Sequence, residues 1–318
     1  MTAALQVVSS SSICMLQDLG RIGQQRFGVP VSGALDAVSL RIANALVGNP
    51  DGTAALETFY KGPVLEVAAG SVRVASIGAA LEVLSGEASR AIPAGQSVRL
   101  VRGERIKVGP CEASLVAYLA VEGGFALPGF LGSLSTFVRA GFGGVDGRPL
   151  KKGDALPLAL ASAPERGKRR APAWDLAPAA RVRVVFGPQD DYFTEQGRRT
   201  LIESSYTVSM QSDRMGMRLE GPALEHAKGF NIVSDGTAPG SIQVPGNGLP
   251  IVLLADRPTT GGYPKIATVA SADLPALGRL RPGARIGFDA VSVEQAEAAR
   301  RELEARIAEL RARLRLPH

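Results

Sequence analysis

Short apolar runs, several of them alternating with polar residues, follow one another along most of the chain and are separated by Gly- and Pro-bearing turns. Alternation with a period of two places successive side chains on opposite faces of a β-strand. The runs that we predict as strands are VRVASIG (72–78), SVRLVRG (97–103), SLVAYLAVEGG (114–124), RVRVVFG (181–187), NIVSD (231–235), SIQVPG (241–246) and PIVLLAD (250–256). Their length and spacing favour a sandwich or barrel over alternating βαβ units, so we predict a mainly β fold with a few helices.

Two internal stretches have helical character. Residues 32–50 form an apolar-periodic segment in which Ser32 or Asp36 can cap the start, and Gly48 followed by Pro50 can end it. Residues 190–203 carry acidic groups in their first turn and predict a second helix.

The C-terminal stretch 292–316 is a charged helix with an apolar seam. The seam, spaced by three or four residues, consists of Ala296, Ala299, Leu303, Ile307, Leu310 and Leu314. Such a seam can pack on the body of the chain or on a partner helix, and we favour the body.

A composition change divides the chain. Residues 161–180 are rich in Ala, Pro and Arg and have no periodicity, which is typical of a linker. We therefore predict an N-terminal lobe (1–160), a C-terminal lobe (181–290) and a terminal helix (291–318).

The stretch SDRMGMRLEGP (212–222) reads as a strand that stops at Gly-Pro. A period of two places Arg214, Gly216 and Arg218 on one face. Guanidinium groups suit carboxylate or phosphate, so the two arginines could hold an anion. They could instead pair with Asp213 and Glu220 on a solvated face, which the spacing alone favours while leaving both interpretations open.

Composition and charge restrict the function classes. The hydrophobic fraction of 45% and the charged fraction of 21% are typical of a soluble globular protein. No apolar run is long enough to span a bilayer, and the first residues lack the pattern of a signal peptide, so we expect a cytoplasmic protein without membrane contact. The net charge is +6, but ERGKRR (165–170) alone supplies half of it, and aromatics are few; nucleic-acid binding is therefore not predicted.

The sequence holds two cysteines and two histidines. These numbers are too small for a disulfide framework or a zinc cluster, and we predict no metal site. They also disfavour Ser-His or Cys-His catalysis, so acid–base chemistry would fall to Asp, Glu, Lys or Tyr.

Three stretches are rich in polar groups among glycines, namely 16–36, 212–222 and 240–269. In the last, Asp256 ends an apolar strand and TTGGY (259–263) follows it as a turn, which is how small-molecule pockets are often built. Taken singly, each stretch could also be a structural turn. GFGGVDG (141–147) is a weak candidate for a phosphate loop, and a hairpin turn is the commoner outcome.

Taken together, these motifs resemble the KipA-like family, whose members are also described as allophanate hydrolase subunit 2, as carboxyltransferase subdomains C and D, or as the C-type subunit of 5-oxoprolinase. The motifs are LQDLGRIGQQRFGVPVSGALDAVSLRIANALVGNPDGTAALE, VEGGFALPGFLGSLST with GFGGVDGRPLKKGD, SDRMGMRLEGP, and APGSIQVPGNGLPIVLLADRPTTGGYPKIATV. They run in order along most of the chain; the linker and terminal helix lie outside the resemblance.

The resemblance implies a cyclophilin-like β-barrel architecture in two lobes and a site shared with a KipI-like partner. It implies membership of an ATP-dependent 5-oxoprolinase complex, completed by a LamB/YcsF-like component, that converts the small amide 5-oxo-L-proline to L-glutamate. ATP with Mg²⁺ is the implied cofactor of the complex, and no biotin is expected on this chain. The alternatives are the carboxyltransferase component of a biotin-dependent urea-carboxylase or allophanate-type system, and a non-catalytic antagonist of a KipI-like protein.

The resemblance also implies site residues. The implied catalytic residues are Asp213, Asp256 and Tyr263; the implied substrate- or anion-binding residues are Arg21, Ser32, Asp36, Asn44, Arg214, Arg218, Gln243, Thr260, Gly261 and Gly262. We expect Arg214 and Arg218 to clamp an anion with help from Arg21, and Asp213 or Asp256 to orient a nucleophile or Mg²⁺. Tyr263 or Thr260 could donate to the amide oxygen. Leu134 and Ile77 depart from the family pattern, where Arg and Thr are usual, and Leu134 leaves the substrate open.

Overall fold

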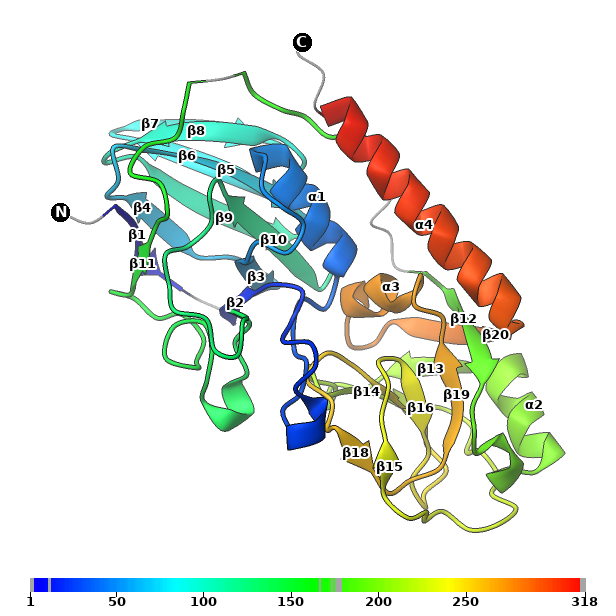
Figure 1. Cartoon of the computed structure of the whole chain (residues 1–318). Helices are drawn as coiled ribbons and strands as arrows, with labels where there is room; N and C mark the ends of the chain where they lie inside the picture. The colour runs from blue at the N-terminus through cyan, green and yellow to red at the C-terminus, as the bar shows by residue number, and fades with distance from the viewer. Residues whose placement is uncertain (1–2, 11–12, 166, 173, 175–178, 315–318) are drawn as a thin grey trace. The chain divides into compact units, whose positions relative to one another are not determined.

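The computed structural model describes residues 3–10, 13–165, 167–172, 174 and 179–314. The chain divides into two compact units (Figure 1). Unit 1 comprises Met1–Arg21, Ser32–Leu176 and Arg306–His318, and unit 2 comprises Ile22–Val31 and Ala177–Ala305. The boundary at residues 176 and 177 falls inside the stretch predicted as a linker. Residues 22–31, which the sequence assigned to the first lobe, group with unit 2.

Unit 1 contains two antiparallel sheets within its described residues. The first has the order β11-β1-β4-β9-β6-β7, with β1 (Ala4–Ser9), β4 (Val64–Val67), β6 (Ala79–Ser85), β7 (Ala88–Ile92), β9 (Arg105–Cys111) and β11 (Ala155–Pro157). The second has the order β2-β3-β10-β5-β8, with β2 (Cys14–Gln17), β3 (Ala55–Phe59), β5 (Ser71–Ile77), β8 (Ser97–Val101) and β10 (Val116–Val121). Both sheets contribute apolar side chains to a single core, among them Leu5 and Leu119. The short 3-10 helix η2 (Val138–Ala140) lies in a loop of unit 1, whereas η1 (Gln25–Phe27) lies within residues 22–31, which group with unit 2.

Helix α1 (Ala37–Val47) packs on β5 and β10, which explains why β10 is buried along its whole length. Asp36, rather than Ser32, caps the helix, because its Oδ1 accepts from the backbone N–H groups of Val38 and Ser39 at 3.1 and 3.0 Å. Gly48 ends the helix with φ of 82°, a left-handed conformation that glycine adopts without strain.

Unit 2 is built on a closed barrel, which within the described residues has the strand order β12-β19-β16-β17-β14-β13-β20. Its strands are β12 (Arg181–Phe186), β13 (Ser205–Val208), β14 (Gly216–Glu220), β16 (Ser241–Gln243), β17 (Ile251–Leu253), β19 (Lys265–Val269) and β20 (Arg285–Ala290). A separate short pair joins β15 (Asp235–Gly236) to β18 (Thr260–Gly261). The barrel interior is apolar, with Val184, Ile242 and Phe288 fully buried. The predicted mainly β fold class with a barrel is confirmed.

Three helical segments accompany the barrel: η3 (Asp190–Tyr192), α2 (Glu195–Glu203) and α3 (Leu274–Arg279). The helix predicted over 190–203 therefore begins later, at Glu195, because the hydroxyl of Thr194 accepts from the N–H of Gly197 at 2.9 Å and caps it there. The strand predicted over 231–235 is wrong except at Asp235, since the preceding residues are irregular.

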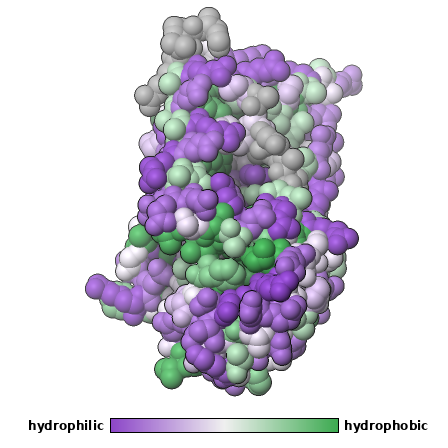
Figure 2. Space-filling model, turned by 90° about the vertical axis from the view of Figure 1, so that its right-hand side faces the viewer, coloured by the Kyte–Doolittle hydropathy of each residue, from purple (hydrophilic) through white to green (hydrophobic). Residues whose placement is uncertain are grey.

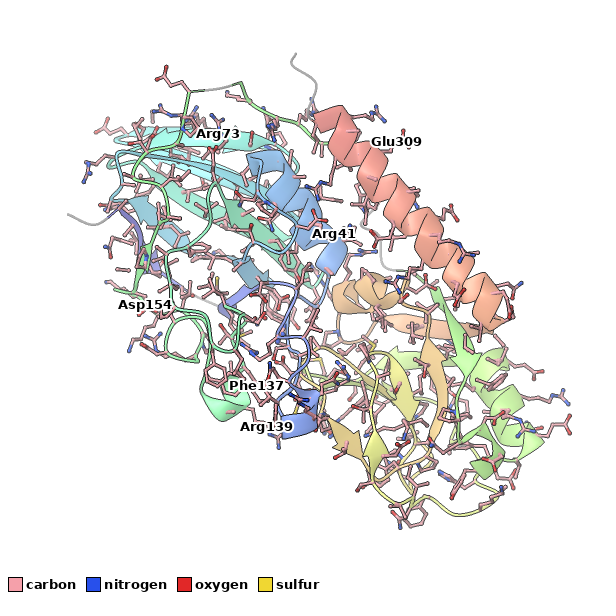
Figure 3. All side chains as sticks on the ribbon, in the orientation of Figure 1. Arg41, Arg73, Phe137, Arg139, Asp154 and Glu309 are labelled. Carbon is pink, nitrogen blue, oxygen red and sulfur yellow. The ribbon has the colours of Figure 1, made fainter. Side chains whose placement is uncertain are left out.

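The terminal helix α4 (Val293–Leu314) confirms the predicted charged helix. Its seam is buried within this chain at Ala299, Ile307, Leu310 and Leu314, as expected for packing on the body. Arg41 projects from α1 (Figure 3), and its Nε lies 2.9 Å from Oδ2 of Asp51, whose other oxygen pairs with Arg311 of α4. None of the helices in the described part of the chain is long and apolar enough to cross a bilayer.

Several described residues of the predicted linker are held on unit 1. The N–H of Arg169 donates to Ser97 Oγ at 2.8 Å, and the N–H of Ser97 donates to the Arg169 carbonyl at 2.9 Å. Ala171 and Gly95 continue this contact through a backbone hydrogen bond of 2.8 Å. The composition that suggested a free linker therefore belongs partly to a segment that follows the edge of β8.

Candidate functional site

The residues of the first motif organise unit 1. Arg21 is 1% exposed, and its guanidinium lies 4.8 Å from the Phe142 ring centroid while it donates to the carbonyl of Ser135. Its Nε also contacts the Phe130 carbonyl at 3.5 Å. These contacts fix the loop that follows β10, so the structure gives Arg21 an architectural task.

Asn44 and Asp36 also make intramolecular contacts. Asn44 Nδ2 donates to the carbonyls of Thr53 and Asp51 at 2.7 and 3.2 Å, and its Oδ1 accepts from Asn49 at 3.1 Å. Asp36 is the cap of α1. Both side chains therefore stabilise the helix and the turn after it.

Ser32 has two unusual properties. It is a non-glycine residue with φ of 56°, a conformation that costs free energy and that tends to occur at functional positions. Its buried Oγ also has no hydrogen-bond partner among the described residues. The next residue, Gly33, lies so close to Leu19 and Gly20 that an added Cβ would stand 3.0 Å from their backbone atoms. Tight backbone packing thus holds Ser32 in place.

A buried polar network that the sequence did not reveal lies beside this motif. Tyr118 Oη donates to Glu57 Oε2 and accepts from the N–H of Asp36 at 2.9 Å. Burial, followed by the charge of Glu57, raises the pKa of Tyr118 well above 10. Burial and Glu57 likewise raise the pKa of the Cys14 thiol, which disfavours a thiolate nucleophile there.

The glycine loop 141–147 is a compact turn. The N–H of Gly144 donates to the Leu134 carbonyl at 2.9 Å, and that of Gly147 donates to the Gly143 carbonyl at 2.8 Å. Phe137, which precedes this loop in the chain (Figure 3), pairs with Phe142 across an isolated bridge. Since both of these amides already donate to backbone carbonyls, the hairpin-turn interpretation is favoured over the phosphate loop.

In the second motif, the structure uses Asp213 and Arg214 internally. Oδ1 of Asp213 accepts from the N–H groups of Met215 and Gly216 at 2.8 and 3.1 Å, which forms the turn into β14. Arg214 makes a bidentate ion pair with Asp256, with Nε to Oδ2 at 2.8 Å and Nη2 to Oδ1 at 3.1 Å. Arg218 is exposed on β14. The two arginines thus have different environments, one buried in a pair and the other in solvent.

The third motif assembles at an end of the barrel in unit 2. Thr260 and Gly261 form β18, opposite Asp235 and Gly236 of β15. Gln243 lies beside Gly261, because a Cβ added to that glycine would stand 3.3 Å from Gln243 Oε1. Gly262 accepts a backbone hydrogen bond of 2.9 Å from Ile232, and Tyr263 is 37% exposed.

Lys265, the first residue of β19, was not among the residues predicted from the sequence. It is directly opposite Gln243 in the β16–β19 ladder. The residue is 4% exposed, and Nζ lies 3.4 Å from Oδ2 of Asp235. Gln189 contacts both residues: its Oε1 accepts from the backbone N–H of Lys265 at 3.2 Å, and its Nε2 donates to Asp235 Oδ2 at 3.3 Å. We call Gln189, Asp235, Gln243, Gly261 and Lys265 the barrel-end cluster.

The contacts within the barrel-end cluster favour the ionised form of the Asp235 carboxyl. The N–H of Gly236 donates to Asp235 Oδ1 at 2.7 Å. This hydrogen bond, followed by the charge of Lys265, lowers the pKa of the Asp235 carboxyl. A lysine is almost never fully buried without a paired charge. The lysine that begins the apolar run KIATV was therefore the sequence feature that could have indicated a buried ion pair here.

Arg257 is a second buried cation that the sequence did not single out. It is 4% exposed, burial lowers its pKa, and its Nη1 contacts the Leu254 carbonyl at 3.5 Å. Its Nε has no hydrogen-bond partner in the described part of the chain. It directly follows Asp256 in the third motif.

An open groove of about 310 Å³ in unit 2 lies apart from these motifs. Its lining consists of Phe186, Ile202, Glu195, Arg198, Arg199 and Glu203. Figure 2, which views the molecule from the side of Figure 1 that carries α2, shows a mostly hydrophilic face with apolar residues exposed among the polar ones. None of the motif residues lines this groove. The barrel-end cluster, in contrast, contains Gln243 and Gly261 of the third motif, and we therefore place the candidate site there.

The described residues contain no group of three or more His, Cys, Asp or Glu side chains arranged to hold a metal ion.

The fold and motifs define a carboxyltransferase-type protein. Residues 27–290 match the family described as "Carboxyltransferase domain, subdomain A and B", so the chain belongs to this family. The resemblance stated from the sequence is thereby confirmed; the matched description carries the letters A and B where that resemblance used C and D.

Among relatives, the C-type subunit of 5-oxoprolinase from Haemophilus influenzae is 36% identical over 311 residues, covering 96% of this chain and 97% of the relative. The corresponding 5-oxoprolinase protein of Escherichia coli is 35% identical, covering 98% of each chain. The crystal structure of Kluyveromyces lactis urea amidolyase superposes with a TM-score of 0.88 at 31% identity, over 97% of this chain and 20% of that one. A fold like that of this chain is thus also one part of a much longer enzyme.

Proposed function

We propose that this chain is one component of a 5-oxoprolinase, which hydrolyses 5-oxo-L-proline to L-glutamate. The observation that carries the proposal is the identity of 35–36% to two proteins named as the C-type subunit of 5-oxoprolinase, over 96–98% of this chain and 97–98% of the relatives. Because both relatives are named as subunits, we propose that the activity belongs to a complex of several proteins. The partners that we propose are a KipI-like protein and a LamB/YcsF-like protein.

The proposed reaction is ATP-dependent. Two waters are consumed in total: one is added across the lactam C–N bond, and the second is used as ATP is converted to ADP and phosphate. The substrate carries a carboxylate beside a stable amide, so the site needs a positive group for the first and polar groups for the second. The buried ammonium of Lys265 and the neighbouring carboxamide of Gln243 meet these two needs within the barrel-end cluster. We assign no ligand in this chain to the Mg²⁺ that accompanies ATP.

Carboxyl transfer is the second candidate function. The superposition on urea amidolyase and the description of the family support it. This chain carries no biotinyl-lysine motif of the MKM type, so carboxyl transfer would require other subunits.

Reconstitution tests both candidates. The chain is co-expressed with the KipI-like and LamB/YcsF-like proteins of its own organism, and the purified complex is assayed for glutamate formed from 5-oxo-L-proline. We expect glutamate only when ATP and all three proteins are present. A complex that leaves 5-oxoproline intact, but carboxylates urea when a biotin carboxylase and biotinylated carrier are added, would replace the first function by the second.

A further inference from the structure

The ammonium group of Lys265 has unused hydrogen-bonding capacity. An ammonium has three N–H donors, and burying them without acceptors costs free energy. Nζ is buried and makes no hydrogen bond of normal geometry to any described residue, although Asp235 Oδ2 lies 3.4 Å away. A fold does not retain such a group for stability, because replacing it with an apolar residue would cost little.

The counter-ion of Lys265 can leave it. The side chain of Asp235 is 54% exposed, whereas that of Lys265 is 5% exposed. Asp235 is therefore solvated and exchanges the ammonium for water at small cost, while Lys265 cannot reach water by itself. An incoming anion would replace Asp235 at the ammonium and supply the missing acceptors.

The surroundings match one small anion. Two residues with neutral carboxamides neighbour Lys265: Gln189 accepts from its backbone N–H and donates to Asp235 Oδ2, and Gln243 is its cross-strand partner. Gly261 leaves open the space where a side chain would meet Gln243. A single positive charge neutralises a single carboxylate. A triphosphate carries several negative charges and would require further cations, which the contacts of this cluster do not provide.

We propose that Lys265 binds the carboxylate of the small-molecule substrate, and that Asp235 occupies the ammonium when the substrate is absent. The identity of the ring that carries this carboxylate rests on the proposed 5-oxoprolinase function; the carboxylate site itself does not. Gln243, on the same face as Lys265, orients the polar part of the ring.

Binding to the full-length chain tests the site without requiring turnover. Isothermal titration calorimetry is carried out with 5-oxo-L-proline, with tetrahydrofuran-2-carboxylate, which keeps the carboxylate but lacks the amide, and with 2-pyrrolidinone, which keeps the amide but lacks the carboxylate. The variants are Lys265→Met, which preserves the buried stem, and Lys107→Met as the control. Lys107 is a 43% exposed lysine of unit 1 that pairs with Glu82.

We expect the wild type and Lys107→Met to bind at least one of the two carboxylates and to bind 2-pyrrolidinone at least about tenfold more weakly, the usual scale of a charge-assisted hydrogen bond. Lys265→Met should lose this discrimination and melt at or above the wild-type temperature, which a merely structural lysine would not do. Binding of tetrahydrofuran-2-carboxylate but not of 5-oxoproline would support the site and contradict the proposed function. Equal carboxylate binding by wild type and Lys265→Met, or no carboxylate binding by the wild type, would overturn the site.

The assembled complex gives a second test. Lys265→Met should raise KM for 5-oxoproline at least about tenfold and leave KM for ATP unchanged. Asp235→Asn should lower KM for 5-oxoproline, because the competing charge is gone. A Lys265→Met variant in which KM for ATP rises instead would identify a phosphate site and refute the proposal. So would an Asp235→Asn variant that binds carboxylates as poorly as Lys265→Met.

Discussion

Arg214 and Asp256 face each other in unit 2 as a buried bidentate ion pair, with both side chains 9% exposed and with Nε–Oδ2 and Nη2–Oδ1 distances of 2.8 and 3.1 Å. The backbone repeats the connection, because the N–H of Asp256 donates to the Arg214 carbonyl at 2.8 Å. From the family resemblance we expected Arg214 to be part of an anion clamp, and Asp256 to be a catalytic residue that could orient a nucleophile or Mg²⁺. The structure shows each of them committed to the other.

Removing one partner of this pair should destabilise unit 2. Arg214→Met leaves the Asp256 carboxylate buried without its counter-charge, at an expected cost of about 3–5 kcal/mol in the free energy of unfolding. Urea unfolding followed by circular dichroism measures the change. The double variant Arg214→Met/Asp256→Leu should recover most of the loss, since no charge then remains buried.

Arg257 provides the matched control for this prediction. It is a buried arginine of the same segment whose Nη1 approaches a carbonyl only to 3.5 Å. Arg257→Met should therefore change the free energy of unfolding by less than about 1 kcal/mol. If Arg214→Met proves as mild as Arg257→Met, the ion pair is not a structural element.

Arg218 separates anion binding from stability. Its side chain is exposed on β14, so Arg218→Ala should leave the melting temperature and the assembly of the complex unchanged. If it holds an anion in the assembled enzyme, as we expected from its motif, ATP turnover should be lost. Arg285→Ala, at another exposed position of the barrel, is the control and should retain activity. Full ATP turnover by Arg218→Ala would remove Arg218 from the site.

Asp154 should make the stability of unit 1 acid-sensitive (Figure 3). Arg148 donates to both of its oxygens at 2.8 and 2.9 Å, and this hydrogen bonding lowers the pKa of Asp154 from 3.8. A lowered pKa contributes stability above pH 3.8, and that stability is lost as the pH falls through the folded-state pKa. Asp154→Asn should thus be less stable than wild type at about pH 7, and unfolding curves between about pH 2 and pH 7 should converge at the acid end. A difference that is constant across this range would contradict the assignment.

Tyr206 should make the stability of unit 2 sensitive to alkaline pH. Burial raises its pKa from 10.0 to about 12, and its hydroxyl has no hydrogen-bond partner among the described residues. Tyr206→Phe should therefore be close to neutral at about pH 7. Between pH 10 and about 12 the wild type should lose stability relative to Tyr206→Phe, because only the unfolded tyrosine ionises there. Tyrosinate absorbance in the near ultraviolet combined with melting curves checks both statements.

Local chemistry made much of the fold predictable. Asp36 and Gly48 bound α1 because capping needs only neighbouring residues, and the seam of α4 follows from its three- and four-residue spacing. Residues 231–235 failed as a strand because an apolar run of that length becomes a strand only if it finds a partner, and here only Asp235 pairs, with Gly261. The stretch 161–180 was predicted as a linker from its composition alone. In its described part, however, Arg169 is hydrogen-bonded to Ser97 of unit 1.

The candidate site was also predictable only in part. The sequence by itself determined the family, and the motifs that carry Gln243, Thr260, Gly261 and Gly262, because these are properties of residue order. Only the tertiary structure decided that Arg214 pairs with Asp256, which is 42 positions away, and that Lys265 is enclosed beside Asp235. Whether a charged side chain is paired, solvated or buried depends on the strands that close around it, and chain order does not state which strands those are.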